Sequence, residues 1–322
     1  RLSLETLLPS LADPEHTPPA TELAALTSLE GENRDRFLDV WRTLSIQRRR
    51  DIIDRLADIG EDNVELDFTI VFMTGLVDDD VQVRAQSVKA LWEYEYDDLV
   101  SVLLRLLRDP EALVRGETAL GLGRFLLRME VLDRDDALAQ QIEGALRARY
   151  HDEAELTDVR GRALEALGVR GKDWVHDLIE GAYSSGDRRL AISAVHAMGR
   201  NADLEWLPTI IEEMESEDAE MRFEAATAAG GIADEQAIPH LAELTADEDA
   251  EVQEAAIAAL GQIGGPAARS ALHAVAAETS DDRVLEAVSD ALAEADFVED
   301  PLSFKLHLDD SVADDAGEDD DE

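Results

Sequence analysis

The residue types best suited to catalysis or metal binding are sparse in this sequence and follow no shared pattern. Seven histidines occur in 322 residues, and none is followed by glutamate, so the sequence has neither an HExxH zinc motif nor a His-Glu pair. They are His16, His151, His176, His196, His240, His273 and His307. The lack of cysteine excludes thiolate nucleophiles, disulfides and zinc–cysteine sites. The sequence therefore favours a protein with no catalytic residue, no cofactor and no metal site.

Carboxylates are abundant, but abundance does not make a site. The chain has 74 acidic and 29 basic residues, which gives a net charge of -45. A catalytic carboxylate pair needs burial or a charged neighbour to separate its two pKa values, and most of these acids fall in predicted turns and on predicted solvent faces. The glycine-containing segments 121–125 and 261–266 match neither a dinucleotide-binding motif nor a P-loop. We interpret the acids mainly as solvated surface.

The charge also limits the partners. A strongly acidic surface repels the phosphates of nucleic acids and of anionic membranes. The sequence has no apolar run near the roughly 18 residues of a membrane span, and its start lacks the pattern of a signal peptide. We therefore expect a cytoplasmic protein whose partner is another protein, with no nucleic acid, no membrane and no obligate small molecule.

A repeat of about 31 residues organises the chain. Each copy has an apolar anchor and a small residue at offset +7, and most copies have a small residue at +4, leucine at +8 and glycine at +9. The anchors are Val83, Val114, Val159, Leu190, Met221, Val252 and Val284. Five of the six gaps are 31 or 32 residues, and the sixth is 45, which predicts an insertion near 126–140.

These offsets predict helices. Positions 0, +4, +7 and +8 lie on one helical face, and small residues there let a neighbouring helix approach closely. Glycine at +9 permits either a left-handed or a closely packed backbone. An acidic turn that can cap the helix precedes each anchor, and a second apolar pattern precedes the turn. Stacked copies of this helix pair predict an all-α fold, a right-handed α-solenoid.

Arginine recurs beside the anchors. Offset +1 holds Arg84, Arg115, Arg160 and Arg222, and we expect these to bond to the aspartates of adjacent turns, forming a ladder. The one strongly basic run, at 47–55, has two interpretations. It is either an exposed helix face paired with Asp51 and Asp54, or a docking patch for an acidic partner or for the acidic C-terminal segment.

The pattern "VxxxAxxALGxIG" preceded by "DxxVR" resembles the short HEAT-like repeats named after phycobilisome lyases, over roughly residues 75–295. The chain as a whole resembles uncharacterised bacterial HEAT-repeat proteins. One enzyme family with HEAT-like repeats, deoxyhypusine hydroxylase, holds a di-iron centre on paired His-Glu motifs, and their absence argues against that activity. We expect residues 1–74 to form a helical cap with degenerate repeats, 75–297 the repeat array, and 298–322 an acidic disordered tail.

The leading functional hypothesis is a non-catalytic protein–protein interaction scaffold or adaptor. Second helices usually line the concave face of an α-solenoid, and offsets +6 and +10 are exposed there, with Trp92 close by. The predicted partner-binding residues are Trp92, Glu93, Arg124, His196, Arg200 and Gln262. The alternative, implied by the name of the repeat, is a bilin lyase-like or chaperone-type protein that acts on a partner protein.

Overall fold

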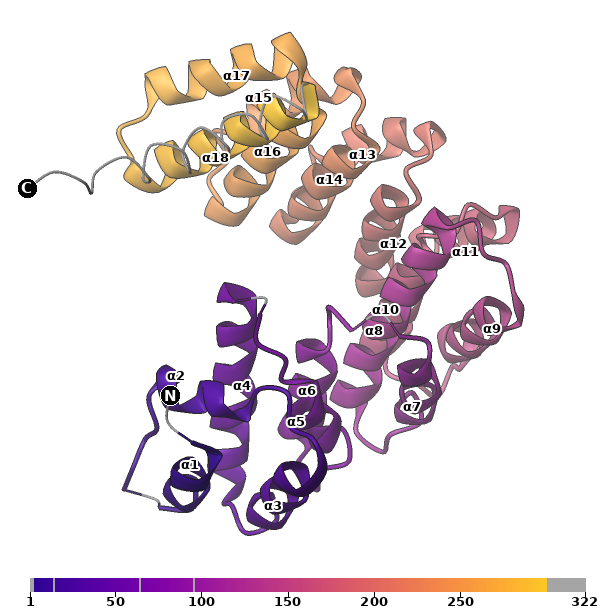
Figure 1. Ribbon diagram of the computed structural model, residues 1–322. Helices are drawn as coiled ribbons and strands as arrows, with labels where there is room; N and C mark the ends of the chain where they lie inside the picture. Colours follow the sequence, from indigo (N-terminus) through magenta and orange to yellow (C-terminus); the bar gives the residue numbers. More distant parts are fainter. Residues whose placement is uncertain (1–2, 14, 64, 95, 300–322) are drawn as a thin grey trace, which may run out of the picture. The chain divides into compact units, whose positions relative to one another are not determined.

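The computed structural model describes residues 3–13, 15–63, 65–94 and 96–299, and the chain divides into two compact units, Arg1–Leu167 and Gly168–Glu322. Within the described residues every regular element is a helix, with eighteen α-helices and three short 3-10 helices (Figure 1). The predicted all-α solenoid class is confirmed in this respect. The predicted acidic tail lies outside the described residues from position 300 onward.

The N-terminal unit stacks second helices α4, α6, α8 and α10 on one another, and α5, α7 and α9 each pair with the helix that follows. The bounds are α1 Leu4–Leu11, α2 Ala20–Leu23, η1 Ala24–Leu26, α3 Gly31–Trp41, α4 Ile46–Asp62, α5 Thr69–Gly75, α6 Val81–Ala90, α7 Asp98–Leu106, α8 Ala112–Val131, α9 Ala137–His151 and α10 Thr157–Leu167.

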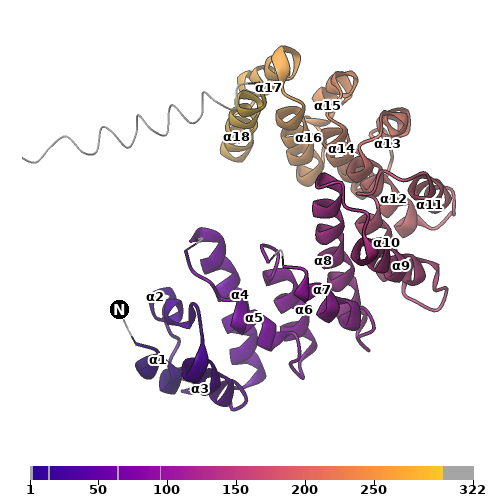
Figure 2. The same cartoon turned by 45° about the vertical axis from the view of Figure 1, so that its right-hand side comes forward.

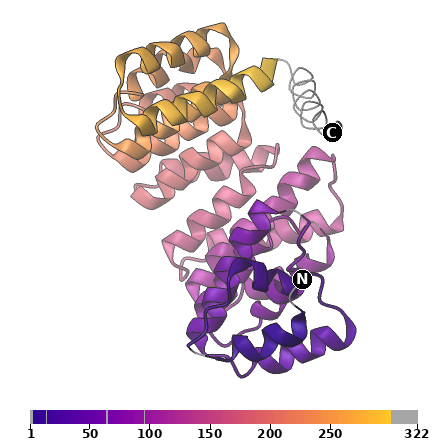
Figure 3. The ribbon, with the colours of Figure 1, turned by 60° about the vertical axis from the view of Figure 1, so that its left-hand side comes forward.

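The C-terminal unit has two layers. Second helices α12, α14, α16 and α18 form one layer, and first helices α11, α13, α15 and α17 pair with them (Figure 2). The last pair, α17 and α18, runs side by side in orange and yellow (Figure 3). The bounds are α11 Asp173–Tyr183, α12 Arg188–Asn201, η2 Leu204–Trp206, α13 Leu207–Glu213, α14 Ala219–Ile232, η3 Glu235–Ala237, α15 Ile238–Leu244, α16 Ala250–Ile263, α17 Gly265–Glu278 and α18 Asp282–Glu299.

The repeat anchors form the core of each stack. All seven are buried, and so are the residues at offset +4. Several aspartates cap the second helices as expected: the Asp80 carboxylate accepts the backbone N–H groups of Gln82 and Val83, and Asp218 accepts that of Glu220. None of the described helices is long and apolar enough to cross a membrane.

The glycine at offset +9 serves close packing. A Cβ atom built on any of five such glycines would lie within 3.1 Å of a backbone atom of the alanine at offset +7 of the next copy. The contacting pairs are Gly123–Ala166, Gly168–Ala197, Gly199–Ala228, Gly230–Ala259 and Gly261–Ala291. The residue with a positive φ angle comes three positions later, at Ala202, Ala233 and Gly264. Glycine is therefore needed so that two backbones can touch.

Three arginines at offset +1 join neighbouring helix pairs, and we term them the bridging arginines: Arg84, Arg115 and Arg222. Each donates through Nη1 to backbone carbonyls of its own turn and through Nε and Nη2 to a carboxylate of the following helix pair. The acceptors are Asp109, Glu155 and Asp247, at 2.6–2.9 Å. The predicted bonds to aspartates are confirmed at Arg84 and Arg222, whereas Arg115 bonds to a glutamate in the equivalent place. Arg160 departs from this pattern, because its Nε donates to the Tyr150 carbonyl at 2.8 Å.

The residues of the predicted insertion near 126–140 lie mainly in the helices α8 and α9. α8 has 20 residues, compared with 14 in each of α12, α14 and α16, and α9 follows it after a short turn.

The basic run at 47–55 lies in α4, and its arginines make hydrogen bonds within the N-terminal unit. Arg48 donates to the carbonyls of Asp13 and His16, and Arg50 pairs with Asp80. These bonds engage Arg48 and Arg50 within the unit, and the docking interpretation stays a prediction, because the acidic segment from position 300 lies outside the described residues.

Candidate functional site

Helix α6 ends earlier than the other second helices, and a site opens at its end. α6 has 10 residues and stops at Ala90, two positions before Trp92, which stands in the slot that holds glycine in most copies. An indole side chain cannot enter the close backbone contact that glycine makes elsewhere. The chain turns instead, with the Trp92 amide donating to the Lys89 carbonyl and the Tyr94 amide to the Leu91 carbonyl.

Aromatic side chains gather around this turn. A pocket of about 490 Å³ lies between the end of α4, the start of α5 and the segment after α6. Five aromatic residues line it: Phe68, Phe72, Trp92, Tyr94 and Tyr96. The Tyr94 and Tyr96 rings lie 5.1 Å apart, Trp92 is 50% exposed and Tyr96 is 71% exposed. Large aromatic faces held open to solvent at one place favour contact with a ligand or partner.

The same pocket is acidic. Four carboxylates line it, from Glu30, Glu61, Asp67 and Glu93, and no lysine, arginine or histidine lies among its described lining residues. Burial, together with the neighbouring Asp98 carboxylate, raises the pKa of Tyr94, so its phenol stays neutral. Carboxylates beside aromatic faces attract a cation through both charge and the ring quadrupole. We term this the acidic–aromatic pocket.

A smaller hollow of opposite charge shares two of these aromatic residues. It is lined by Trp92, Tyr94, Arg124, Phe125 and Arg128. The Nη1 atom of Arg124 is buried and has no hydrogen-bond partner within the described part of the chain. Burial lowers the pKa of Arg124 to about 10, which still leaves it charged at neutral pH. A partly buried, unpaired guanidinium favours an incoming carboxylate, because the ion pair would offset the cost of desolvation.

Three of the predicted partner-binding residues therefore come together in the N-terminal unit. Trp92 shares one pocket with Glu93 and the other with Arg124. The other three lie in the C-terminal unit. His196 of α12 contacts Glu224 of α14, with Nδ1 and Oε2 2.9 Å apart.

Arg200 is exposed near the end of α12, and Gln262 lines a shallow groove on α14 and α16 with Phe223. Phe68, Tyr94 and Tyr96 are not among the residues predicted from the sequence. The signal that identifies the two tyrosines is an aromatic "YEY" segment directly after the copy that lacks its glycine.

Comparison with family models identifies the repeat. The model for HEAT repeats matches residues 71–167 and 207–293, which together make up more than half of the chain. No curated protein matches the sequence.

Solved structures share the fold at low sequence identity. The complex of CpcE and CpcF of phycocyanin lyase from Nostoc sp. PCC7120 superposes with a TM-score of 0.54 and 15% identity, covering 88% of this chain and 97% of that one. Yeast importin-beta (Kap95p) gives a TM-score of 0.50 and 13% identity over 91% of this chain, which spans 46% of the importin chain. At these identities the likeness is one of fold alone.

Proposed function

The chain belongs to the HEAT-repeat family, and from this premise we propose that it is a non-catalytic scaffold or adaptor that binds a partner protein. The observation that carries the proposal is the acidic–aromatic pocket, which joins four carboxylates to exposed aromatic faces. HEAT-like stacks present long rows of helix ends and faces, which suit an extended partner segment. A cytoplasmic location is part of the same proposal.

The chemistry of the pocket selects the partner. We expect a segment whose lysine or arginine side chain enters the acidic–aromatic pocket and stacks against Trp92 or Tyr96. Arg124, on the other side of Trp92, then pairs with a carboxylate of the same segment. The site would bind a cation on one side of Trp92 and a carboxylate on the other. These two charges would fix the orientation of the partner segment and add to its affinity.

The predicted residues of the C-terminal unit enter the proposal as a second contact. Arg200 and Gln262 are both exposed on second helices, at the same repeat offset. His196 is half-buried and paired with Glu224, which fixes its ring for a partner to contact.

An array of synthetic peptides tests the proposal, with each lysine and arginine replaced in turn by glutamine. The full-length protein should bind a subset of peptides, and the glutamine replacements should abolish binding. Trp92→Ala should weaken binding by about tenfold or more, as expected for an aromatic anchor. Phe297→Ala is the matched control, because Phe297 is also 50% exposed but lies on α18.

Charge reversal supplies the second control. Glu93→Arg places a cation in the pocket and should abolish binding, whereas Glu215→Arg makes the same change in net charge on an exposed site of the C-terminal unit. Equal loss in the two variants would show that overall acidity, not this pocket, attracts the peptides. The proposal would then be wrong.

The alternative hypothesis is a bilin lyase-like or chaperone-type activity toward a partner protein. The superposition on the CpcE–CpcF complex motivates it, although the likeness extends only to the fold. Incubating the protein with a bilin and recording its absorbance spectrum separates the two. A saturable spectral shift that survives Glu93→Arg would favour the alternative, and an unchanged spectrum would count against it.

A further inference from the structure

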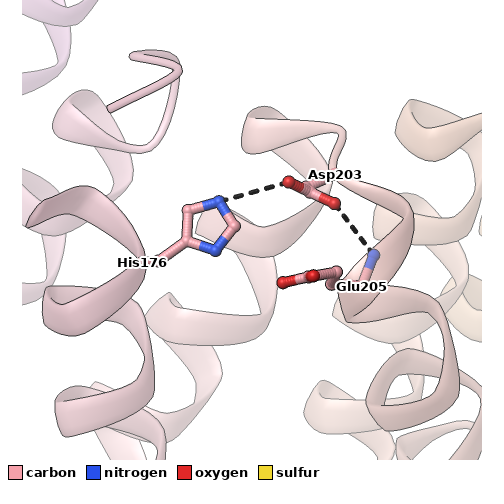
Figure 4. A group of neighbouring side chains, drawn as sticks. All are labelled: His176, Asp203 and Glu205. Carbon is pink, nitrogen blue, oxygen red and sulfur yellow. Dashed lines mark hydrogen bonds and ion pairs between the residues drawn. The ribbon is translucent and has the colours of Figure 1, made fainter. Parts of the chain in front are cut away.

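One group of potential metal ligands lies in the C-terminal unit, at a junction between helix pairs. His176 projects from α11, and Asp203 and Glu205 come from the segment between α12 and α13 (Figure 4). One ligand atom from each of the three residues lies within 4.8 Å of the other two. The sequence predicted no metal site, because no histidine is followed by glutamate and the histidines follow no shared pattern; His176 and Asp203 lie 27 positions apart in the chain.

The spacing of the first two ligands suits a small divalent ion. His176 Nε2 and Asp203 Oδ2 are 3.4 Å apart, which is long for a hydrogen bond between these groups. Two ligands bound tetrahedrally at about 2.1 Å from one zinc ion stand about 3.4 Å apart. Glu205 is exposed, so its carboxylate has the freedom to complete the set.

Neighbouring side chains hold both elements in place. The Trp206 ring lies against the His176 imidazole, with centroids 4.9 Å apart. Trp206 also donates its indole N–H to the Asn201 side-chain oxygen, and the Asn201 amide donates to the carbonyls of Gly168 and Arg170. Such outer contacts orient metal ligands before an ion binds.

The site is accessible to an ion in solution. It opens into a cavity of about 770 Å³, whose lining also includes Asp173, Asp177 and Lys172. The carboxylates outnumber the single lysine and raise the local concentration of cations, and the open side leaves room for a water molecule as the fourth ligand.

The next junction of the same unit shows what is distinctive here. Asp234 begins η3 as Asp203 begins η2, and each carboxylate accepts the backbone N–H two residues on at 2.9 Å. In that junction glutamine, Gln236, stands where this one has Glu205, and Leu207 stands 31 residues after His176. The second junction therefore keeps the helix cap and lacks two of the three ligands.

We propose that His176, Asp203 and Glu205 form a binding site for one divalent transition-metal ion of the Zn²⁺ type, which clips α11 to the segment after α12. One nitrogen and two carboxylate oxygens match the ligand preference of zinc. Bound there, the ion ties two consecutive helix pairs of the C-terminal unit to each other.

Calorimetric titration with Zn²⁺ tests the proposal. The full-length, tag-free protein is first treated with a chelator, and millimolar Mg²⁺ is present to occupy weak carboxylate sites. We expect one tight zinc site per chain. His176→Ala and Asp203→Asn should each weaken it by at least about tenfold, while Asp234→Asn, which changes the equivalent cap, should leave it unchanged.

A Co²⁺ absorption spectrum provides the second readout. Intense visible bands of a four-coordinate ion should appear in the native protein and be absent in His176→Ala, with far-UV circular dichroism confirming that both are folded. Zinc binding of equal strength in the native and His176→Ala proteins would overturn the proposal. So would an equal loss in Asp203→Asn and Asp234→Asn, which would indicate general acidity.

Discussion

The second helices of the C-terminal unit and helix α6 of the N-terminal unit solve the same packing problem differently. α12, α14 and α16 are each 14 residues long, and glycines such as Gly199 bring each backbone against the next. α6 is 10 residues long and has Trp92 in the glycine slot. The first arrangement closes the surface between neighbouring copies, and the second opens it into the acidic–aromatic pocket.

Two arginines, Arg222 and Arg124, differ in the same way between the regular stack and the pocket. Arg222 is nearly buried and fully engaged, with its guanidinium bridging the Ser216 carbonyl and the Asp247 carboxylate. Arg124 is partly buried, and its Nη1 has no partner in the described part of the chain. Residues that build the stack are satisfied internally, whereas Arg124 is left unsatisfied beside an open pocket, which is why we propose that it meets a carboxylate of the partner.

The largest expected effect on stability comes from replacing one of the bridging arginines. Arg222→Met should lower the free energy of unfolding by about 3 kcal/mol, because it strands the buried Asp247 carboxylate. Urea unfolding followed by circular dichroism measures this. Arg188→Met is the control: its pair with Asp218 is exposed on the arginine side, so the loss should stay below about 1 kcal/mol. Equal losses would contradict the distinction between bridging and surface pairs.

The close glycine contact gives the next largest effect. Gly199→Ala should destabilise the protein by about 2 kcal/mol, because the added methyl group meets the backbone of Ala228 and the helices must separate. Gly181→Ala in α11 has open space around it and should instead stabilise by roughly 0.5–1 kcal/mol through higher helix propensity. Thermal unfolding of the two variants should move in opposite directions. A stabilising Gly199→Ala would show that the backbones need not touch.

Arg124 should behave in the opposite way to Arg222. Arg124→Met removes an unpaired, partly buried charge and keeps the apolar part of the side chain, so it should raise the free energy of unfolding by about 1 kcal/mol. The same variant should weaken binding of the peptides selected on the array. Destabilisation by this change would mean that Arg124 has a structural role, and the contrast between the two arginines would be lost.

The smallest expected effect is a change of stability with pH. The hydrogen bonds from Arg50, aided by the backbone N–H groups of Gln82 and Val83, lower the pKa of Asp80 from its ordinary value near 3.8 to about 2. A lowered carboxyl pKa adds stability above pH 3.8, and that stability is lost as the pH falls toward 2. Asp80→Asn, which can still cap α6, should therefore cost roughly 0.5–1 kcal/mol at pH 7. The cost should vanish by about pH 2, as measured by urea unfolding at each pH; a difference that did not change with pH would contradict the assignment.

The sequence by itself determined the repeat and its local physics. The offsets of Val252, Ala256 and Ala259 lie on one helical face because of the 3.6-residue period, and aspartates before the anchors cap helices through contacts within a few residues. The arginine ladder followed from the period, since residues one repeat apart in the chain must lie side by side in the stack. The sequence left open whether the glycine at offset +9 serves a left-handed or a closely packed backbone.

Tertiary structure decided where the candidate sites lie. That glycine contacts a backbone at offset +7 depends on how two helices cross, which no single copy encodes. The acidic–aromatic pocket combines Glu61, Asp67 and Trp92 from three segments, and the metal-ligand group combines His176 with Asp203 across 27 residues. Such sites lie at repeat positions that do not recur, so periodicity carries no signal for them. Their geometry exists only once the helix pairs have stacked.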